Sequence, residues 1–147
     1  MEIKITVNVS GNEPVEIKVD IPEKGESKAS NPKPILSEYA VYFDETSCHW
    51  RKNARWNKEF LIQQQKFANE KLNHRGYLFL NEVYDMLGVP RTAIGQVVGW
   101  VYDEDNPVGD NHVDFDIYAG RNVAFVNEWE TRVLLDFNVD GDILKYL

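Results

Sequence analysis

The sequence predicts an α+β fold: an antiparallel sheet with one longer and one short helix, plus an N-terminal β-hairpin. Three observations lead to this class. Apolar and polar residues alternate near the N-terminus, helical periodicity follows in the middle of the chain, and strand-like runs succeed one another in the last third. Strands that follow one another without a helix pair antiparallel, because a parallel pair needs a long crossover connection.

The N-terminal hairpin is the clearest local pattern. Residues 2–9 and 15–21 alternate between aliphatic and polar side chains, and residues 10–14 between them contain Gly and Pro. Two such runs around a turn are typical of a β-hairpin. An isolated hairpin is marginally stable in water, so its aliphatic face is expected to contact its own domain, another copy or a protein partner. The residues expected to make that contact are Ile3, Ile5, Val7, Val15, Ile17 and Val19.

The composition divides the chain into three parts. Residues 22–35 are polar, contain three prolines and show no apolar periodicity, which indicates a linker. The predicted organisation is therefore a hairpin appendage at 1–21, a Pro-rich linker at 22–35 and an α+β domain at 36–147. A chain of 147 residues is long enough for one ordinary core and short for two.

Two helices are expected in the α+β domain. Apolar side chains recur at helical spacing over residues 57–73, with Asn57 as the predicted N-cap. A short second helix is expected over residues 82–87. Asn81 is its predicted cap, and Gly88 its predicted end because glycine readily adopts the left-handed conformation.

Strands are expected at 39–43, 97–102, 112–118 and 133–139, and a helical turn at 143–147. In the third of these strands Val113, Phe115 and Ile117 are predicted to face the core. In the fourth, Val133, Leu135, Phe137 and Val139 are predicted to do so. Gly99 interrupts the second strand, where it indicates a bulge or a close approach of another backbone.

The negative charge is concentrated in the last third of the chain. Residues 1–100 carry 13 acids and 13 bases, whereas residues 101–147 carry 11 acids and three bases. Such a surface repels phosphate backbones, so we expect no direct binding to nucleic acid. An acidic face suits a basic protein partner, although it also simply keeps a protein soluble. The residues expected to contact such a partner are Asp103, Glu104, Asp105 and Asp110, with Asp114 and Asp116 beside them.

One motif resembles a calcium-binding loop. Asp136, Asn138 and Asp140 are followed by Gly141, which matches the first half of such a loop. The bidentate Glu that calcium needs at loop position 12 falls on Leu147, the last residue of the sequence. Polar residues on the outer face of a strand, followed by an Asp-Gly turn, explain the pattern without a metal.

A second motif places metal-ligand types two residues apart. His112, Asp114 and Asp116 share one face of the predicted strand, where Zn²⁺ or Mn²⁺ finds suitable donors. A solvated face on an antiparallel strand explains this alternation equally well. We therefore expect no metal ion and no other cofactor.

No catalytic constellation is evident. No pair of carboxylates is singled out by spacing, and the segment from Gly95 to Gly99 lacks the lysine of a phosphate-binding loop. No run approaches the roughly 18 apolar residues that a membrane span needs. The sequence therefore predicts neither an enzyme nor a membrane-spanning protein.

Several motifs resemble a known family. They are the run from Gly76 to Gly88 (GYLFLNEVYDMLG), GQVVGWVYD, VDFDIY and LLDFNVDG. Together, over roughly residues 39–147, they resemble an uncharacterised family carried by phages and prophages of Gram-positive, often gut-dwelling, bacteria. Its members usually have a membrane-spanning segment before this domain, where the present chain has the hairpin and linker. The resemblance implies no catalytic residue, and implies action in the bacterial host cytoplasm or in the virion.

Three functional hypotheses follow. The favoured one is a non-enzymatic, phage-encoded protein-interaction or structural and assembly module that binds a protein partner or associates with itself. The first alternative is an acidic inhibitor of a host nuclease or nucleic-acid-binding defence protein, which uses the acidic residues of 103–116. The second alternative is a metal-binding enzyme built on one of the two candidate metal motifs.

Overall fold

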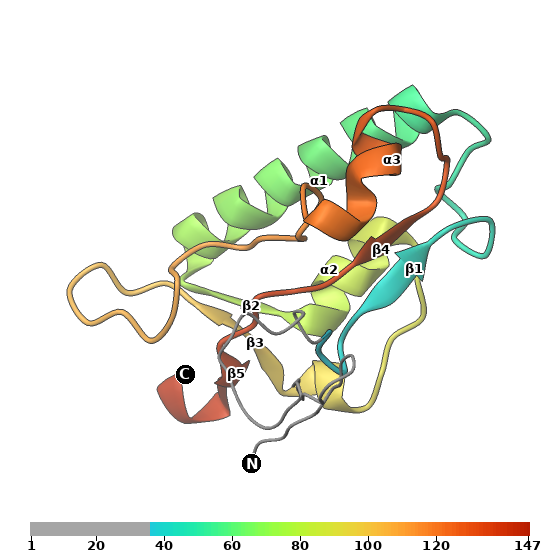
Figure 1. The fold of residues 1–147 in the computed structure, drawn as a ribbon. Helices are drawn as coiled ribbons and strands as arrows, with labels where there is room; N and C mark the ends of the chain where they lie inside the picture. The colour runs from blue at the N-terminus through green and yellow to red at the C-terminus, as the bar shows by residue number, and fades with distance from the viewer. Residues whose placement is uncertain (1–35) are drawn as a thin grey trace, which may run out of the picture. The chain divides into compact units, whose positions relative to one another are not determined.

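The computed structural model describes residues 36–147 of the chain. The predicted hairpin at 1–21, with its six partner-binding candidates, and the linker lie outside the described residues. The α+β class is confirmed: helices pack against strands that pair only antiparallel (Figure 1). Among the described residues the strands form two small sheets instead of the single sheet expected.

The first sheet pairs β1 (Val41–Phe43) with β4 (Val133–Leu135), and Tyr42 lies opposite Leu134. The second sheet has the order β2 (Tyr77–Phe79), β3 (Val98–Val101) and β5 (Gly141–Asp142). A Cβ atom added to Gly99 of β3 would lie 2.0 Å from the carbonyl oxygen of Leu78. The predicted close approach of another backbone at Gly99 is therefore confirmed.

Helix α1 (Ala54–Arg75) is longer than expected and begins one turn earlier. The side chain of Asn53 accepts a hydrogen bond from Trp56 N at 2.9 Å and caps the helix. The prediction that Asn57 is the cap is wrong. Asn57 is buried inside the first turn, where its amide bonds the backbone of Arg51 and Thr131. The helix ends at Gly76, which has a φ of 92°.

Helix α2 (Leu80–Leu87) follows β2 directly and ends at Gly88, as expected. The prediction that Asn81 caps this helix is wrong. Glu82 reaches back to accept a hydrogen bond from Phe79 N at 2.9 Å, which satisfies a free N–H of the first turn. Asn81 is buried instead, and its amide group bonds both the N–H and the carbonyl of Thr92.

Residues 112–118 are not a strand, contrary to the prediction. Val113, Phe115 and Ile117 are buried as expected, but side chains bond this backbone where a neighbouring strand was expected. Asn69 accepts from Val113 N at 2.7 Å, and Gln65 accepts from Phe115 N at 2.8 Å. The alternation therefore predicted correctly which side chains are buried. It predicted incorrectly that another strand would bond the backbone.

The predicted strand at 133–139 is shorter than expected, because its ladder ends at Leu135. Beyond that point Asp136 N donates to Phe115 O at 3.2 Å, so the chain turns toward residues 112–118. The predicted inward residues Val133, Leu135 and Phe137 are buried, and Val139 is partly buried. The chain closes with a 3₁₀ turn at Leu144–Tyr146, as expected.

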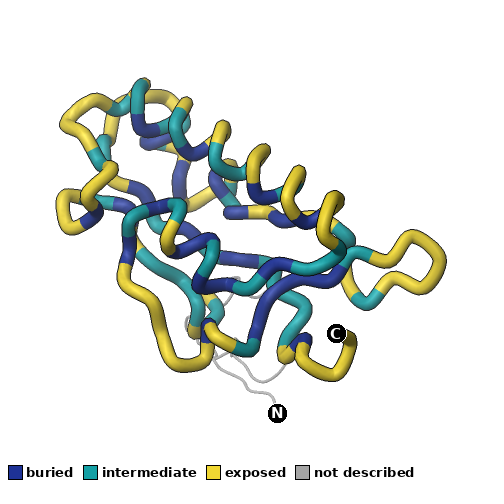
Figure 2. The backbone as a smooth tube through the Cα atoms, turned by 180° about the vertical axis from the view of Figure 1, so that it is seen from behind, coloured by how far each residue is buried: buried dark blue, intermediate teal, exposed yellow. Residues whose placement is uncertain are grey.

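A single core joins the helices to both sheets. The core includes Leu61, Ala68 and Leu72 of α1 and Trp100 of β3, which are fully buried. It also includes Tyr84 of α2, which is 1% exposed. Figure 2 shows these buried positions on the inner side of α1 and along α2 and β3, with exposed positions on loops and the outer side of α1. No helix within residues 36–147 is both long and apolar enough to cross a membrane.

Candidate interaction surface

The outer face of the β1–β4 pair presents accessible hydrophobic side chains beside a hollow. Side chains alternate across a strand, so Phe43, Val133 and Leu135 face the core while Tyr42 and Leu134 face outward. Tyr42 is 60% exposed. This face is the floor of an open hollow of about 440 Å³. Its lining residues are Tyr42, Arg121, Asn122, Ala124, Phe125, Glu130, Arg132, Val133 and Leu134.

One wall of the hollow is the turn Gly120–Asn122 with the short helix α3 (Val123–Val126). The buried side chain of Asn122 fixes this wall to β4, because it donates to Leu134 O at 3.0 Å and to Asp116 O at 3.1 Å. Arg121 donates to the same Leu134 carbonyl. The wall therefore rests on side-chain bonds to a strand edge.

The two arginines that line the hollow are paired with carboxylates. Arg132 donates to both carboxylate oxygens of Glu45, at 2.8 and 2.7 Å, and this hydrogen bonding lowers the pKa of Glu45. Arg121 lies 2.9 Å from a carboxylate oxygen of Asp116. The apolar residues that also line the hollow are Tyr42, Ala124, Phe125, Val133 and Leu134.

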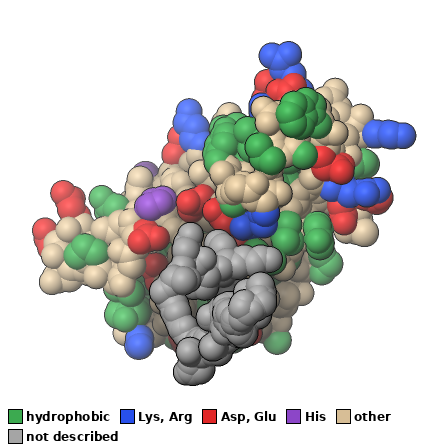
Figure 3. Space-filling view, in the orientation of Figure 1, with side chains coloured by type: hydrophobic (Ala, Val, Ile, Leu, Met, Phe, Trp, Pro, Cys, Tyr) green, Lys and Arg blue, Asp and Glu red, His purple; other side chains and the backbone are tan. Residues whose placement is uncertain are grey.

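Three more large apolar side chains stand exposed within three residues, along the chain, of residues that line the hollow. Tyr118 is 66%, Val123 57% and Trp129 78% exposed. Trp129 follows α3. Its backbone N–H donates to Ala124 O at 2.8 Å, which fixes the main chain at this residue. Figure 3 shows hydrophobic side chains gathered over α3 and over the β1–β4 pair on one face of the molecule. We call Tyr42, Tyr118, Val123 and Trp129 the aromatic face.

The acidic residues predicted to bind a partner lie on a projecting loop, residues 102–112 (Figure 1). Its neck is fixed because Asn111 bonds both the N–H and the carbonyl of Asp103, at 3.2 and 3.0 Å. The Asp103 carboxylate accepts from the N–H groups of Asp105 and Asn106. Glu104 and Asp105 lie exposed on the loop, whereas Asp110 accepts from Asn138 at 3.0 Å.

The structure brings the two candidate metal motifs together. Asp114, Asp116, Asp136 and Asn138 line a shallow hollow of about 260 Å³. Their polar groups are engaged with protein atoms. Asp136 accepts from Ser37 N at 2.8 Å, Asp114 accepts from Asp116 N at 2.8 Å, and Asp116 pairs with Arg121. Within residues 36–147 no group of three or more His, Cys, Asp or Glu side chains is arranged to hold a metal ion.

The remaining metal candidates tie the acidic loop to the sheet. Asn138 accepts from Trp100 Nε1 at 2.9 Å and donates to His112 O. Asp140 accepts from Val101 N at 2.8 Å. Burial raises the pKa of Asp140, and the charge of Asp110 adds to that effect. The ring nitrogen Nδ1 of His112 lies 3.0 Å from the carbonyl oxygen of Asp110.

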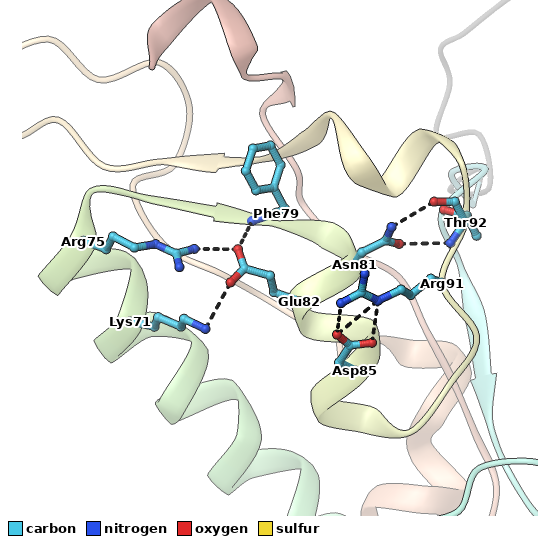
Figure 4. Close-up of polar contacts among 8 residues, drawn as sticks. All are labelled: Lys71, Arg75, Phe79, Asn81, Glu82, Asp85, Arg91 and Thr92. Atoms are coloured by element: carbon cyan, nitrogen blue, oxygen red, sulfur yellow. Dashed lines mark hydrogen bonds and ion pairs between the residues drawn. The ribbon is translucent and has the colours of Figure 1, made fainter.

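A polar network on α2 was not expected from the sequence (Figure 4). Glu82 pairs with Lys71 and Arg75 of α1 while it caps α2 at Phe79. Burial alone would raise the pKa of Glu82, but hydrogen bonds from Arg75, Phe79 N–H and Lys71 outweigh it and lower that pKa. A carboxylate held ionised in this way joins α2 to α1 and is a poor proton donor. The spacing of Phe79 and Glu82, three residues apart at a helix start, was the available signal.

Residues 4–147 match the model of a family of unknown function, DUF6353. The chain belongs to this family. No curated protein and no solved structure matches the chain. The resemblance to an uncharacterised family, placed at residues 39–147, is thus correct at that level, and the DUF6353 match also includes most of the first 38 residues.

Within DUF6353 this chain offers exposed hydrophobic side chains and an acidic loop as its candidate contact surfaces. Sequence reasoning missed the aromatic face, because Val123 and Trp129 lie in segments without clear periodicity and Tyr118 is the last residue of the predicted strand at 112–118. A Trp in a short polar segment, such as Asn127-Glu-Trp-Glu130, is the signal that was available.

Proposed function

We propose that this DUF6353 protein is a non-enzymatic interaction module that binds a protein partner or a second copy of itself. The aromatic face is the observation that carries the proposal. All four of its side chains are more than half exposed; Tyr42 lines the hollow, and the other three lie within three residues along the chain of residues that line it. Exposed apolar clusters with a polar rim mark interaction sites, and Trp and Tyr are enriched among residues that dominate binding energy.

The context that we propose is a phage or prophage, with action in the bacterial host cytoplasm or in the virion. This part rests on the motifs that resemble a family carried by phages and prophages. It predicts that the partner is a virion, assembly or host protein.

The test is a pull-down with the full tagged chain from host cells after prophage induction. Partners captured by the unchanged protein are compared with those captured by a variant that carries Tyr118→Ser and Trp129→Ser. The matched control carries Ile62→Ser and Ile94→Ser, which are 40% and 44% exposed on α1 and on the 3₁₀ turn Ile94–Gln96.

We expect the aromatic-face variant to lose its partners by about tenfold or more, since removal of one interface hot spot costs about 2 kcal/mol. The control should retain them. Equal capture by both variants would exclude the aromatic face as the contact.

A second candidate function is inhibition of a basic nucleic-acid-binding host protein through the acidic loop. It is favoured by the run 102–116, which carries six acids and no Lys or Arg, and by the hydrogen-bonded neck of the loop. The test compares binding by the unchanged chain and by a Glu104→Gln, Asp105→Asn variant. Such a complex should weaken steeply with added salt, and the variant should show a smaller salt dependence. Binding unchanged at about 0.5 M salt would reject this candidate.

A further inference from the structure

The backbone of Tyr42 faces the free edge of β1. Two bonds on β4 establish this direction. Leu134 O accepts from Arg121 and Asn122, and Asp136 N donates to Phe115 O, so both groups point away from β1. Residues opposite each other in an antiparallel pair either exchange both bonds or neither. Tyr42 lies opposite Leu134 and therefore also directs its N–H and carbonyl away from the pair.

No residue within 36–147 bonds the N–H or the carbonyl of Tyr42. Strand β1 has β4 as its neighbour in the sheet, and its other edge pairs with no described strand. The Tyr42 side chain is also 60% exposed. An unpaired edge with free N–H and carbonyl groups is a template for another strand.

We propose that a second copy of this chain pairs on that edge, β1 antiparallel to β1, about a two-fold axis through the Tyr42 pair. The inference rests on the proposed interaction function and names its occupant. A strand with both free groups on one residue is its own complement, because two Tyr42 residues exchange both N–H···O bonds across the axis. The result is one sheet with the order β4, β1, β1, β4.

The side chains also fit this pairing. Tyr42 would lie opposite Tyr42 of the second copy, and Val41 opposite Phe43 of the second copy. Aromatic pairs and aromatic pairs with β-branched residues stabilise adjacent strands. Residues 39–43 carry no Asp, Glu, Lys or Arg, and Asp44 would lie opposite Ala40 of the second copy. No like charges therefore oppose each other across this edge. A second copy can bond the free N–H and carbonyl groups of the edge without a strand from a different protein.

The first test is a disulfide trap in the full chain. Residues that exchange both bonds in an antiparallel pair have Cα atoms about 5.5 Å apart, within the range that a disulfide spans. Tyr42→Cys in a Cys48→Ser background should therefore form a covalent dimer on mild oxidation. The control is Leu144→Cys in the same background, at a position that is 51% exposed and lies outside the aromatic face. The pairing would be overturned if the Tyr42→Cys protein formed no dimer, or no more dimer than the control.

The second test separates backbone pairing from side-chain contact. Tyr42→Pro removes an N–H that β4 does not use, and proline is tolerated at edge positions of this kind. Tyr42→Thr keeps the N–H and the strand preference but removes the ring. Sedimentation equilibrium should show association by the Thr variant and its loss in a folded Pro variant. Association by both variants would overturn the proposal, and if the Pro variant does not fold, the disulfide trap still decides.

The pull-down distinguishes the two ideas. Retained partners that depend on Trp129, together with no preferential disulfide at Tyr42, would reject the two-fold pairing alone. If the disulfide dimer forms at Tyr42 but partner capture is unchanged by the Trp129 substitution, the aromatic face is rejected as the partner contact and the pairing is retained.

Discussion

Three asparagines are buried within the described residues, and each holds two segments together. Asn57 bonds the backbone of Arg51 and Thr131, Asn81 bonds Thr92, and Asn122 bonds Asp116 and Leu134. An amide side chain can donate and accept at once, so it substitutes for a missing backbone partner. Removal of such a side chain leaves backbone groups buried without partners, which is more costly than loss of a solvent-exposed bond.

Replacement of Asn57 by Ala should lower the free energy of unfolding by about 2–3 kcal/mol, because three backbone bonds are lost in a buried site. Asn53→Ala removes the true N-cap of α1 and should cost about 1 kcal/mol. Chemical denaturation of both variants measures the difference. A larger loss at Asn53 than at Asn57 would contradict the role assigned to the buried amide.

Glu82→Gln should make stability less dependent on pH. The pKa of Glu82 in the folded protein is lowered from 4.5. The ionised carboxylate therefore stabilises the fold at pH values above the unfolded pKa. This stabilisation is lost as the pH falls through the folded pKa. The variant should therefore be less stable than the unchanged protein by about 1 kcal/mol at neutral pH. That difference should vanish below the folded pKa.

Urea denaturation at neutral pH and at an acid pH low enough to protonate Glu82 in the folded protein measures the effect. The control is Glu59→Gln, whose carboxylate pairs with Arg55 at 3.4 Å on the surface and should contribute little at either pH. A Glu82→Gln deficit that persists unchanged in acid would contradict the ionic role of Glu82.

At the scale of elements, side chains of α1 give the backbone of residues 112–118 the hydrogen-bond partners that a neighbouring strand would otherwise provide. Gln65 and Asn69 are four residues apart and so lie on the same side of the helix, from which they accept the N–H groups of Phe115 and Val113. Asn69 also donates to Val113 O at 2.9 Å. These bonds replace a strand ladder and fix a segment that has no regular structure.

Amide hydrogen exchange should report these bonds one at a time. In Asn69→Ala the Val113 amide should exchange at least tenfold faster, because loss of about 1.4 kcal/mol of protection corresponds to that factor. In Gln65→Ala the Phe115 amide should respond in the same way. Each variant is the control for the other, and unchanged exchange at both amides would show that these bonds do not protect the segment.

Sequence periodicity predicted the helices α1 and α2, the strands β1, β3 and β4 and the inward residues of 112–118, because these depend on burial along the chain. It did not predict β2 or β5. It failed where side chains distant in sequence provide the partner. Asn57 and Asn81 have the residue type of a cap, but tertiary contacts with Thr131 and Thr92 decide their place. The aromatic face was equally hidden, since an exposed Trp129 and a buried Trp100 look alike in sequence.

At the scale of the whole molecule, residues 36–147 contain one core and should fold without residues 1–35. Their hydrophobic cluster joins α1, α2, both sheets and the segment 112–118. A chain that begins at Leu36 should therefore retain a cooperative thermal transition, since a domain with its own core folds as a unit.

The control truncation begins at Val41 and removes three hydrogen bonds that attach the start of this unit. Ser37 N and Oγ donate to Asp136, and Tyr84 Oη donates to Tyr39 O at 2.8 Å. Loss of Tyr39 leaves the buried Tyr84 hydroxyl without its acceptor, so the shorter chain should be less stable by about 2–3 kcal/mol. Calorimetry of the two truncations and the full chain measures this order. Loss of cooperative unfolding in the chain that begins at Leu36 would mean that the core needs the N-terminal residues, and the predicted boundary at residue 36 would be wrong.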